Sequence, residues 1–418
     1  MKRLISTVTS AIMAFSAVSA VMPVSAAAEG DGTGRQVEYL TRGLTAVKTD
    51  GGVFLSWRLL GTEPLTQTYD IYKNGELYQS GIDAVNYTDT DGFSYDTYQV
   101  VPSGTAADAV DSNCEVTTVW TDNYYDIPLN KPAAGIISQT GASYTYSVND
   151  ASVADLDGDG ELEYIIKWDP SNSQDNSQRG FTGKVYIDAY EFDGTQLWRI
   201  DLGQNIRAGA HYTQFIVYDF DGDGKAEMAV KTAPGTMDGQ GVYVNEAAGF
   251  TGTYDDNDNS YVVTRSGSSQ GMVISGEEYL TMFDGETGAT LNTIDYPIER
   301  GSVSSWGDSY GGRSERYLAG VAYLNGMTPS LIECRGYYEK ASMAALDWNR
   351  ETGFELLWSR IDTWERDGDG NWGTYLTDET GTKTRIARET SIYAQGNHNL
   401  SICDADNDGR DEIVFGSA

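Results

Sequence analysis

Short runs in which apolar and polar residues alternate predict β-strands along most of the chain. Residues 53–59 and 68–73 are two such runs, and the second ends at Asn74-Gly75, a pair typical of a type I′ hairpin turn. Trp57, in the first run, is expected to point inward. Short aromatic-bearing strands over roughly 100 residues are typical of a fibronectin type III-like β-sandwich. We predict such a domain at residues 35–130.

After a linker, the alternation becomes a repeat that runs over residues 140–418. Each unit has an apolar strand, an acidic loop, a second strand and then two strands joined by a Gly-containing turn. The acidic loops start at Asp155, Asp219 and Asp404, while a fourth loop at Tyr323 keeps the strands but lacks the carboxylates. Repeats of about four strands are typical of propeller blades. We therefore predict an all-β chain in which the sandwich is followed by a Ca-binding β-propeller.

The unit that contains Asp404 stops soon after its acidic loop, before any hairpin turn. Four units with the last unfinished are not expected to close a ring. The propeller is therefore predicted to be incomplete, and the chain to be a fragment of a longer protein.

The acidic loops share one nine-residue pattern, with carboxylates at positions 1, 3, 5 and 9 and Gly at position 6. Alternate side chains of a tight turn point to one centre, and Gly supplies the backbone angle that closes the turn. Anionic oxygen ligands favour a hard cation with flexible coordination, which indicates Ca²⁺ in a structural role. The predicted metal ligands, position 7 included, are Asp155, Asp157, Asp159, Glu161, Glu163, Asp219, Asp221, Asp223, Lys225, Glu227, Asp404, Asp406, Asp408, Arg410 and Glu412.

The charge of the chain limits its partners. The formal net charge is -34, which makes nucleic acid and anionic membranes poor partners, and we expect a monomer. Lys2 and Arg3 precede an apolar stretch that ends near a small-residue cleavage site, so residues 1–26 are predicted to be a signal peptide of a secreted, extracellular protein. A membrane anchor is the alternative, but the stretch is short and rich in small and hydroxyl residues.

Three cations stand twelve residues after loop position 1 in successive units: Lys167, Lys231 and Arg335. One residue type at one position of each unit could form a ring of charge that binds a polyanion, although solvated lysines at strand ends explain the spacing equally well. The two histidines, His211 and His398, both come just before the first strand of a unit. They are candidates for substrate binding, with a purely structural role as the alternative.

Several stretches resemble family 11 rhamnogalacturonan lyases, and the similarity runs from about residue 35 to the end of the chain. The stretches are residues 42–44, 53–58, 149–160, 167–172, 207–212 and 395–400. The resemblance implies an eight-bladed propeller, stapled by Ca²⁺, behind a small β-sandwich. It also implies β-eliminative cleavage of rhamnogalacturonan I, the acidic plant cell-wall polysaccharide in which rhamnose and galacturonate alternate, leaving a 4,5-unsaturated galacturonate.

By the same resemblance, Asn149 and Asp169 match positions that contact galacturonate, Asp150 and His398 reach a metal or a sugar, and Asn397 joins the substrate-binding set. The family's catalytic Arg and Lys are expected beyond Ala418, the last residue, so no catalytic residue is assigned. Two alternatives stay open: a non-catalytic Ca-dependent propeller that binds acidic polysaccharide, and an integrin-like adhesion propeller. Endo or exo action is left open as well.

Overall fold

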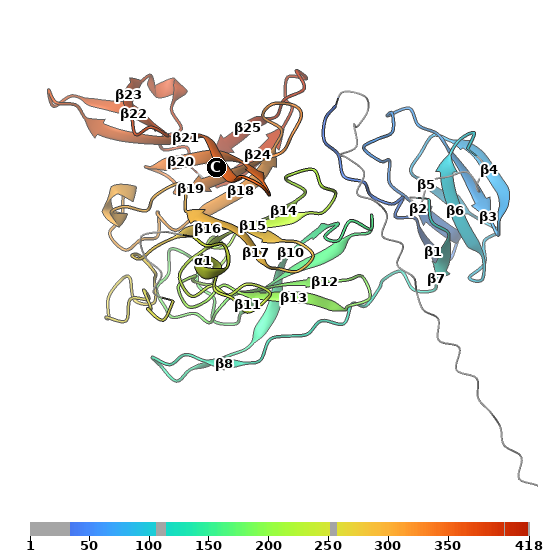
Figure 1. Cartoon of the computed structure of the whole chain (residues 1–418), viewed down its shortest axis with the longest axis horizontal. Helices are drawn as coiled ribbons and strands as arrows, with labels where there is room; N and C mark the ends of the chain where they lie inside the picture. The colour runs from blue at the N-terminus through green and yellow to red at the C-terminus, as the bar shows by residue number, and fades with distance from the viewer. Residues whose placement is uncertain (1–33, 106–113, 251–256, 397, 417–418) are drawn as a thin grey trace, which may run out of the picture.

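The computed structural model describes residues 34–105, 114–250, 257–396 and 398–416, and these form an almost entirely β structure (Figure 1). The exceptions are the single-turn helix α1 (Val244–Ala247) and the 3₁₀ turns η1 (Val303–Trp306) and η2 (Arg388–Thr390). The predicted all-β class is confirmed. The predicted signal peptide lies outside the described residues. Among the described residues, no helix has the length and apolarity that a membrane-spanning helix needs.

The N-terminal strands form the predicted β-sandwich, which lies at the right of Figure 1. The neighbouring order is β4-β3-β6-β7-β1-β2-β5, with β1 and β7 parallel. Trp57 is buried, as predicted, and meets Tyr69 edge-on with ring centroids 5.5 Å apart. Asn74 and Gly75 both have positive φ, as a type I′ turn requires. The strands are β1 (Thr45–Thr49), β2 (Gly52–Ser56), β3 (Tyr69–Lys73), β4 (Glu76–Ile82), β5 (Asn86–Asp89), β6 (Thr97–Pro102) and β7 (Thr117–Trp120).

The rest of the chain folds into successive antiparallel sheets, which we call units 1 to 4, after a small hairpin of β8 (Gly135–Ile136) and β9 (Ser143–Tyr144). Unit 1 comprises β10 (Tyr146–Ala154), β11 (Glu163–Pro170), β12 (Tyr186–Tyr190) and β13 (Gln196–Asp201). Unit 2 comprises β14 (Phe215–Tyr218), β15 (Glu227–Thr232), β16 (Tyr279–Asp284) and β17 (Thr290–Asp295). The described part of unit 4 comprises β24 (Asn399–Cys403) and β25 (Glu412–Gly416).

Unit 3 has two strands more than the predicted four. It comprises β18 (Tyr317–Ala322), β19 (Ser330–Arg335), β20 (Ala341–Asn349), β21 (Gly353–Arg366), β22 (Trp372–Asp378) and β23 (Lys383–Ile386). Asp362 of β21 pairs with Ala341, the first residue of β20, so the last four residues of β21 extend past the sheet. They pair with β22 and form an arm that projects at the upper left of Figure 1.

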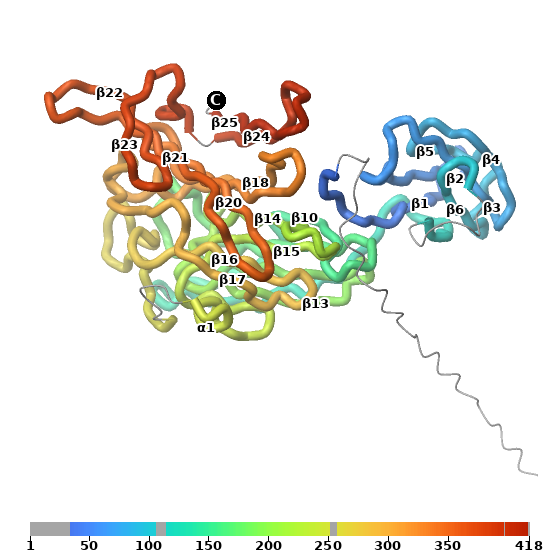
Figure 2. Tube along the Cα trace, turned by 45° about the horizontal axis from the view of Figure 1, so that its top comes forward, coloured from blue at the N-terminus to red at the C-terminus, as the bar shows by residue number. Residues whose placement is uncertain are grey.

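The units pack against one another through their first strands. β10 contacts β14, β14 contacts β18, and β18 contacts β24, and Figure 2 shows these strands in succession. Apolar clusters fill the space between consecutive sheets: Met228 and Tyr279 belong to the cluster between units 1 and 2, and Trp306 and Leu331 to the one between units 2 and 3.

Residues 34–41, here called the N-terminal strap, precede the sandwich but lie on the loops of the units. The backbone N–H of Thr41 donates to the carbonyl of Gly160, 2.7 Å away, in the first acidic loop. Gln36 donates to the carbonyl of Asp219 at 2.6 Å from its side chain and to that of Met327 at 2.8 Å from its backbone. The strap therefore connects loops from units 1, 2 and 3.

Candidate functional site

The three acidic loops share most of their internal hydrogen bonds. Position 1 directly follows the first strand of its unit, and its carboxylate accepts backbone N–H groups from within the loop. Position 9 is the first residue of the second strand, and its carboxylate accepts the N–H of position 2. This scaffold brings the carboxylates of positions 1, 3 and 9 to within 4.8 Å of one another. The clusters are Asp155, Asp157 and Glu163; Asp219, Asp221 and Glu227; and Asp404, Asp406 and Glu412.

Burial makes the first two clusters, those of units 1 and 2, unfavourable as bare anions. It raises the pKa of Asp155 to about 6 and that of Glu163 to about 8, and neighbouring loop carboxylates add to both shifts. In the second loop burial likewise raises the pKa of Asp219 to about 6 and that of Glu227 to about 9. Crowded, buried carboxylates of this kind are stabilised by a cation, so the donor set fits a hard metal ion.

Two parts of the predicted ligand pattern do not belong to these clusters, and their role as metal ligands stays a prediction. The position 5 aspartates are outside the clusters found among the described residues, and each accepts the backbone N–H of position 7. The position 7 side chains do not join the clusters either: the ammonium of Lys225 pairs with Glu286 at 2.6 Å. The affected residues are Asp159, Asp223, Asp408, Glu161, Lys225 and Arg410.

The second loop also receives a cation from unit 3. Arg350, in the β20–β21 turn, lies 3.1 Å from Glu227, 3.6 Å from Asp221 and 3.0 Å from Asp284. The guanidinium charge of Arg350 therefore already compensates part of the negative charge of the second acidic loop.

The expected ring of exposed cations does not form, which corrects the prediction. Lys231 and Arg335 do converge, but on the buried carboxylate of Glu278, at 3.0 and 2.7 Å. Arg335 has no exposed side-chain surface and also pairs with Glu315 at 3.0 Å. Because these charges are buried and compensated, the two residues hold units 2 and 3 together and do not offer a surface to a polyanion.

Lys167 lies in unit 1, beside the residues that resemblance assigns to galacturonate. Lys167 is 2% exposed and is the cross-strand partner of Asp150 in the pairing of β10 with β11. Burial raises the pKa of Asp169, and the charge of Lys167 offsets part of that shift. The Oδ1 atom of Asp169 is buried without a hydrogen-bond partner among the described residues. Asn149 is exposed, and it is the extra residue of a β-bulge between Val148 and Asp150. Bulges re-aim side chains and are frequent beside active sites.

The two histidines lie in one cluster at the end of the units opposite the acidic loops. His211 Nδ1 is 3.0 Å from both Asp175 Oδ2 and Asn176 Oδ1, which are acceptors, so this nitrogen carries the proton. His211 Nε2 then accepts from Arg316 Nη1 at 2.9 Å. Burial and the Arg316 charge lower the pKa of His211, which keeps the ring neutral and fixes this tautomer.

Aromatic rings complete this cluster. Arg316 lies over the ring of Tyr337 at 5.2 Å, and Tyr337 and Tyr338 contact the ring of His398 with centroids 5.5 and 5.0 Å apart. The groups come from all four units, so this is where the units share one surface.

Two of the sequence predictions for the site fall outside the described residues. Asn397, predicted to bind substrate, is one of them. Ala418 is also outside them, and the catalytic Arg and Lys that the resemblance implies are expected beyond it. The predicted position of these two catalytic residues therefore stays a prediction.

Sequence reasoning missed Arg316; it considered the polar loop at residues 167–178 for sugar recognition without singling out Asp175 and Asn176. Arg316 stands one residue before the first strand of unit 3, close to the place that His211 and His398 occupy in units 2 and 4. This shared position before the first strand of a unit is the sequence feature that could have identified Arg316. Asp175 and Asn176 lie in a polar loop whose sequence does not distinguish them from their neighbours.

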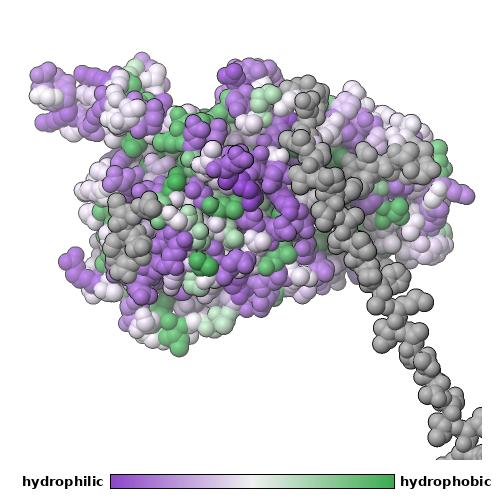
Figure 3. Space-filling view, in the orientation of Figure 1, coloured by the Kyte–Doolittle hydropathy of each residue, from purple (hydrophilic) through white to green (hydrophobic). Residues whose placement is uncertain are grey.

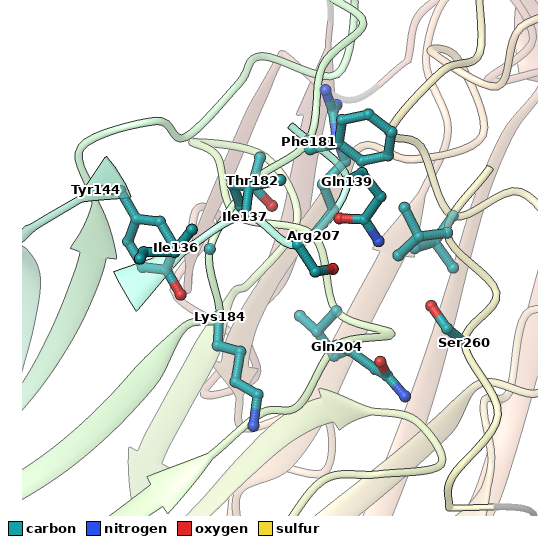
Figure 4. Close-up of a pocket in the computed structure, with 16 residues that line it drawn as sticks. Ile136, Ile137, Gln139, Tyr144, Phe181, Thr182, Lys184, Gln204, Arg207 and Ser260 are labelled. Atoms are coloured by element: carbon teal, nitrogen blue, oxygen red, sulfur yellow. The ribbon is translucent and has the colours of Figure 1, made fainter. Parts of the chain in front are cut away.

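A cavity of about 190 Å³ lies apart from this cluster, between the β8–β9 hairpin, the loop before β12 and the segment between β15 and β16 (Figure 4). Phe181, Lys184 and Gln204 line it, and Arg207 connects it to the cluster by donating to the carbonyl of Asp175 at 3.2 Å. Arg207 is itself 4% exposed, so its role there is structural.

Known proteins match the whole chain. The family model for the C-terminal domain of rhamnogalacturonan lyase family 11 matches residues 124–418, and that for the beta-sheet domain of rhamnogalacturonan I lyases matches residues 35–120. The rhamnogalacturonan endolyase YesW of Bacillus subtilis is 48% identical over 100% of the chain and 60% of its own length. The exolyase YesX of that organism is 45% identical over 92% of the chain and 56% of its own length.

Solved structures agree with these matches. The crystal structure of the rhamnogalacturonan lyase YesW has a TM-score of 0.76 at 47% identity, covering 92% of this chain and 59% of that one. The family 11 lyase of Bacillus licheniformis has a TM-score of 0.73 at 46% identity, covering 94% of this chain and 59% of that one. The chain thus spans about three fifths of the length of these relatives.

Proposed function

The chain belongs to rhamnogalacturonan lyase family 11, and on that basis we propose that the protein cleaves the rhamnogalacturonan I backbone by β-elimination. The observation that carries the proposal is the 48% identity to an endolyase over the full length of the chain. The site supports it, because residues from four units converge on one surface that offers a fixed cation, Arg316, beside aromatic rings.

β-Elimination is favoured by a cation next to the substrate carboxylate. Elimination removes the C5 proton of galacturonate and expels the rhamnosyl oxygen from C4. A cation that pairs with the carboxylate lowers the cost of the negative charge that develops as the proton leaves. We assign Arg316 to this pairing, with His211 as its positioning residue, and we assign Asn149 and Asp169 to galacturonate contacts. None of the described residues is assigned as the base.

We further propose that Ca²⁺ binds the clusters at positions 1, 3 and 9 of the acidic loops. A bound cation would neutralise the clustered carboxylates and hold the first two strands of units 1, 2 and 4 together. The units would then be blades of an eight-bladed propeller. Secretion is proposed from residues 1–26 alone, and N-terminal sequencing of protein from the culture medium would test it by showing cleavage near residue 26.

The function is tested by the absorbance of the unsaturated galacturonate, with protein made from its full reading frame. We expect the absorbance to rise on rhamnogalacturonan I, to stay flat on homogalacturonan, and to fall in rate when EDTA removes divalent cations. Binding of the polymer without any rise would refute the lyase and favour a non-catalytic polysaccharide-binding protein.

A further inference from the structure

The arm of unit 3 carries a group of aromatic rings, here called the aromatic platform: the exposed Trp364 and Trp372 and the half-buried Tyr393. The two indole rings are parallel, with an interplanar angle of 4° and centroids 6.1 Å apart, and Tyr393 continues the row at 6.2 Å from Trp364. Trp364 is 39% and Trp372 50% exposed. Large aromatic side chains gathered in the open are typical of binding surfaces.

Two arginines lie beside the rings of this platform. The Arg366 guanidinium is 5.0 Å from the Trp372 ring centroid, and that of Arg388 is 5.4 Å from Trp364 and 5.0 Å from Tyr393. Neither forms an ion pair within the part of the chain that the structure describes. Other cations of the arm do: Arg385 pairs with Asp367 at 3.4 Å, and Lys383 with Glu365.

Uncompensated cations are notable in a chain of net charge -34. A guanidinium stacked on a ring keeps its N–H groups at its edge, where they can bind a carboxylate in two-pronged fashion. The platform therefore combines apolar faces with carboxylate-binding edges, and its surroundings are hydrophilic, as Figure 3 shows for the visible face of the arm.

The platform is continuous with the site. The arm projects from the end of unit 3 where Arg335 and Ala341 lie, which is the end that carries the histidine cluster. Gly396, three residues after Tyr393, forms a β-bridge with Tyr338, whose ring contacts His398 at 5.0 Å. The charged neighbours of Tyr393 other than Arg388 are Glu339 and Arg313, which pair with each other at 2.9 Å.

We propose that the aromatic platform is an outlying subsite for the same acidic polysaccharide chain that the histidine cluster binds. Sugar rings would stack on the indoles, while Arg366 and Arg388 bind uronate carboxylates. Neutral and acidic sugars alternate along the polysaccharide, and the platform likewise offers aromatic rings for neutral sugars and guanidinium groups for acidic ones. The substrate class rests on the proposed function. Because the platform lies on a projecting arm, it selects long chains over short oligosaccharides.

The test compares the affinity of the protein for polymeric rhamnogalacturonan I with its affinity for a short oligosaccharide of the same repeat, both by calorimetry. The double variant W364A/W372A should bind the polymer about ten-fold more weakly, a ratio equivalent to about 1.4 kcal/mol. Its affinity for the oligosaccharide should not change. The variant R366Q/R388Q keeps the rings and should show the same selective loss, so the test does not depend on the tryptophans' contribution to folding.

Phe93 and Tyr95 of the sandwich provide a matched control, because they form another exposed stacked pair, with an interplanar angle of 4°. The variant F93A/Y95A should bind the polymer as the wild type does. Wild-type affinity in both arm variants would overturn the subsite and would favour another occupant of the arm, such as a further segment of a longer chain. The lyase proposal is judged separately: product without platform-dependent binding refutes the subsite alone, and platform-dependent binding without product refutes the lyase alone.

Discussion

Replacing Glu278 with Gln should destabilise the contact between units 2 and 3 strongly. The Glu278 carboxylate, 7% exposed, lies 2.5 Å from Arg300, 2.7 Å from Arg335 and 3.0 Å from Lys231. In the variant Arg300 and Arg335 would share Glu315, and Lys231 would be left beside Glu333, a buried carboxyl group whose pKa burial raises and Lys231 lowers.

The size of the effect follows from that imbalance. Removing one partner of a buried ion pair costs about 3–5 kcal/mol, because the remaining charge stays buried. We therefore expect the free energy of unfolding at pH 7 to fall by about 3–5 kcal/mol, measured by urea denaturation.

The pH dependence gives a second measure. The three cations hold the pKa of Glu278 below its usual range, so its stabilisation is present at neutral pH and is lost as pH falls below about 4.3. The difference between wild type and E278Q should shrink over that range. As a control, E339Q removes the half-exposed pair with Arg313 and should cost less than about 1 kcal/mol. Equal losses in the two variants, or less than about 1 kcal/mol for E278Q, would refute the reasoning.

Three further outcomes are expected. In scanning fluorimetry, EDTA should lower the thermal unfolding midpoint and added Ca²⁺ should restore it. The variant E163Q should recover less of the lost midpoint when Ca²⁺ is added. An unchanged midpoint in EDTA would contradict metal binding. Hydrogen bonds from Lys73, Tyr98 and Tyr78 hold the pKa of Asp89 at about 2, so the sandwich should lose stability as pH falls from about 4 towards 2, and D89N should lack that loss in circular dichroism. R316A should weaken rhamnogalacturonan binding about ten-fold, equivalent to about 1.4 kcal/mol. R316K should restore binding only in part, because an ammonium cannot bind a carboxylate in two-pronged fashion. Equal binding by R316A and wild type would remove Arg316 from the site.

Local patterns predicted the features that depend on local geometry. The spacing within each acidic loop determines its turn, so the clusters at positions 1, 3 and 9 and the strands beside them were predictable. The side-chain directions at position 5 could not be predicted from the spacing alone, and these aspartates accept the backbone N–H of position 7 outside the clusters.

Features that depend on distant partners were not predictable. The repeat placed Lys231 and Arg335 correctly along their strands, yet their exposure is decided by Glu278, which precedes a different strand. The position of a residue along its strand indicates which end of the sheet its side chain is near. Whether that side chain is exposed to solvent depends on the neighbouring unit. The arm was visible in principle, since turn motifs at residues 367–371 and 378–382 indicate two extra hairpins.

The N-terminal strap has a consequence for the order in which the protein is completed during synthesis. Gln36 bonds to Asp219, 183 residues later, and its carbonyl accepts from Tyr323, 287 residues later. Residues 34–41 must therefore wait until the first strand of unit 3 and the loop after it have been made. At roughly 5–20 residues per second that wait lasts tens of seconds, during which the sandwich can fold but the strap cannot dock. A chaperone that recognises extended segments would meet this part of the chain first and release it last.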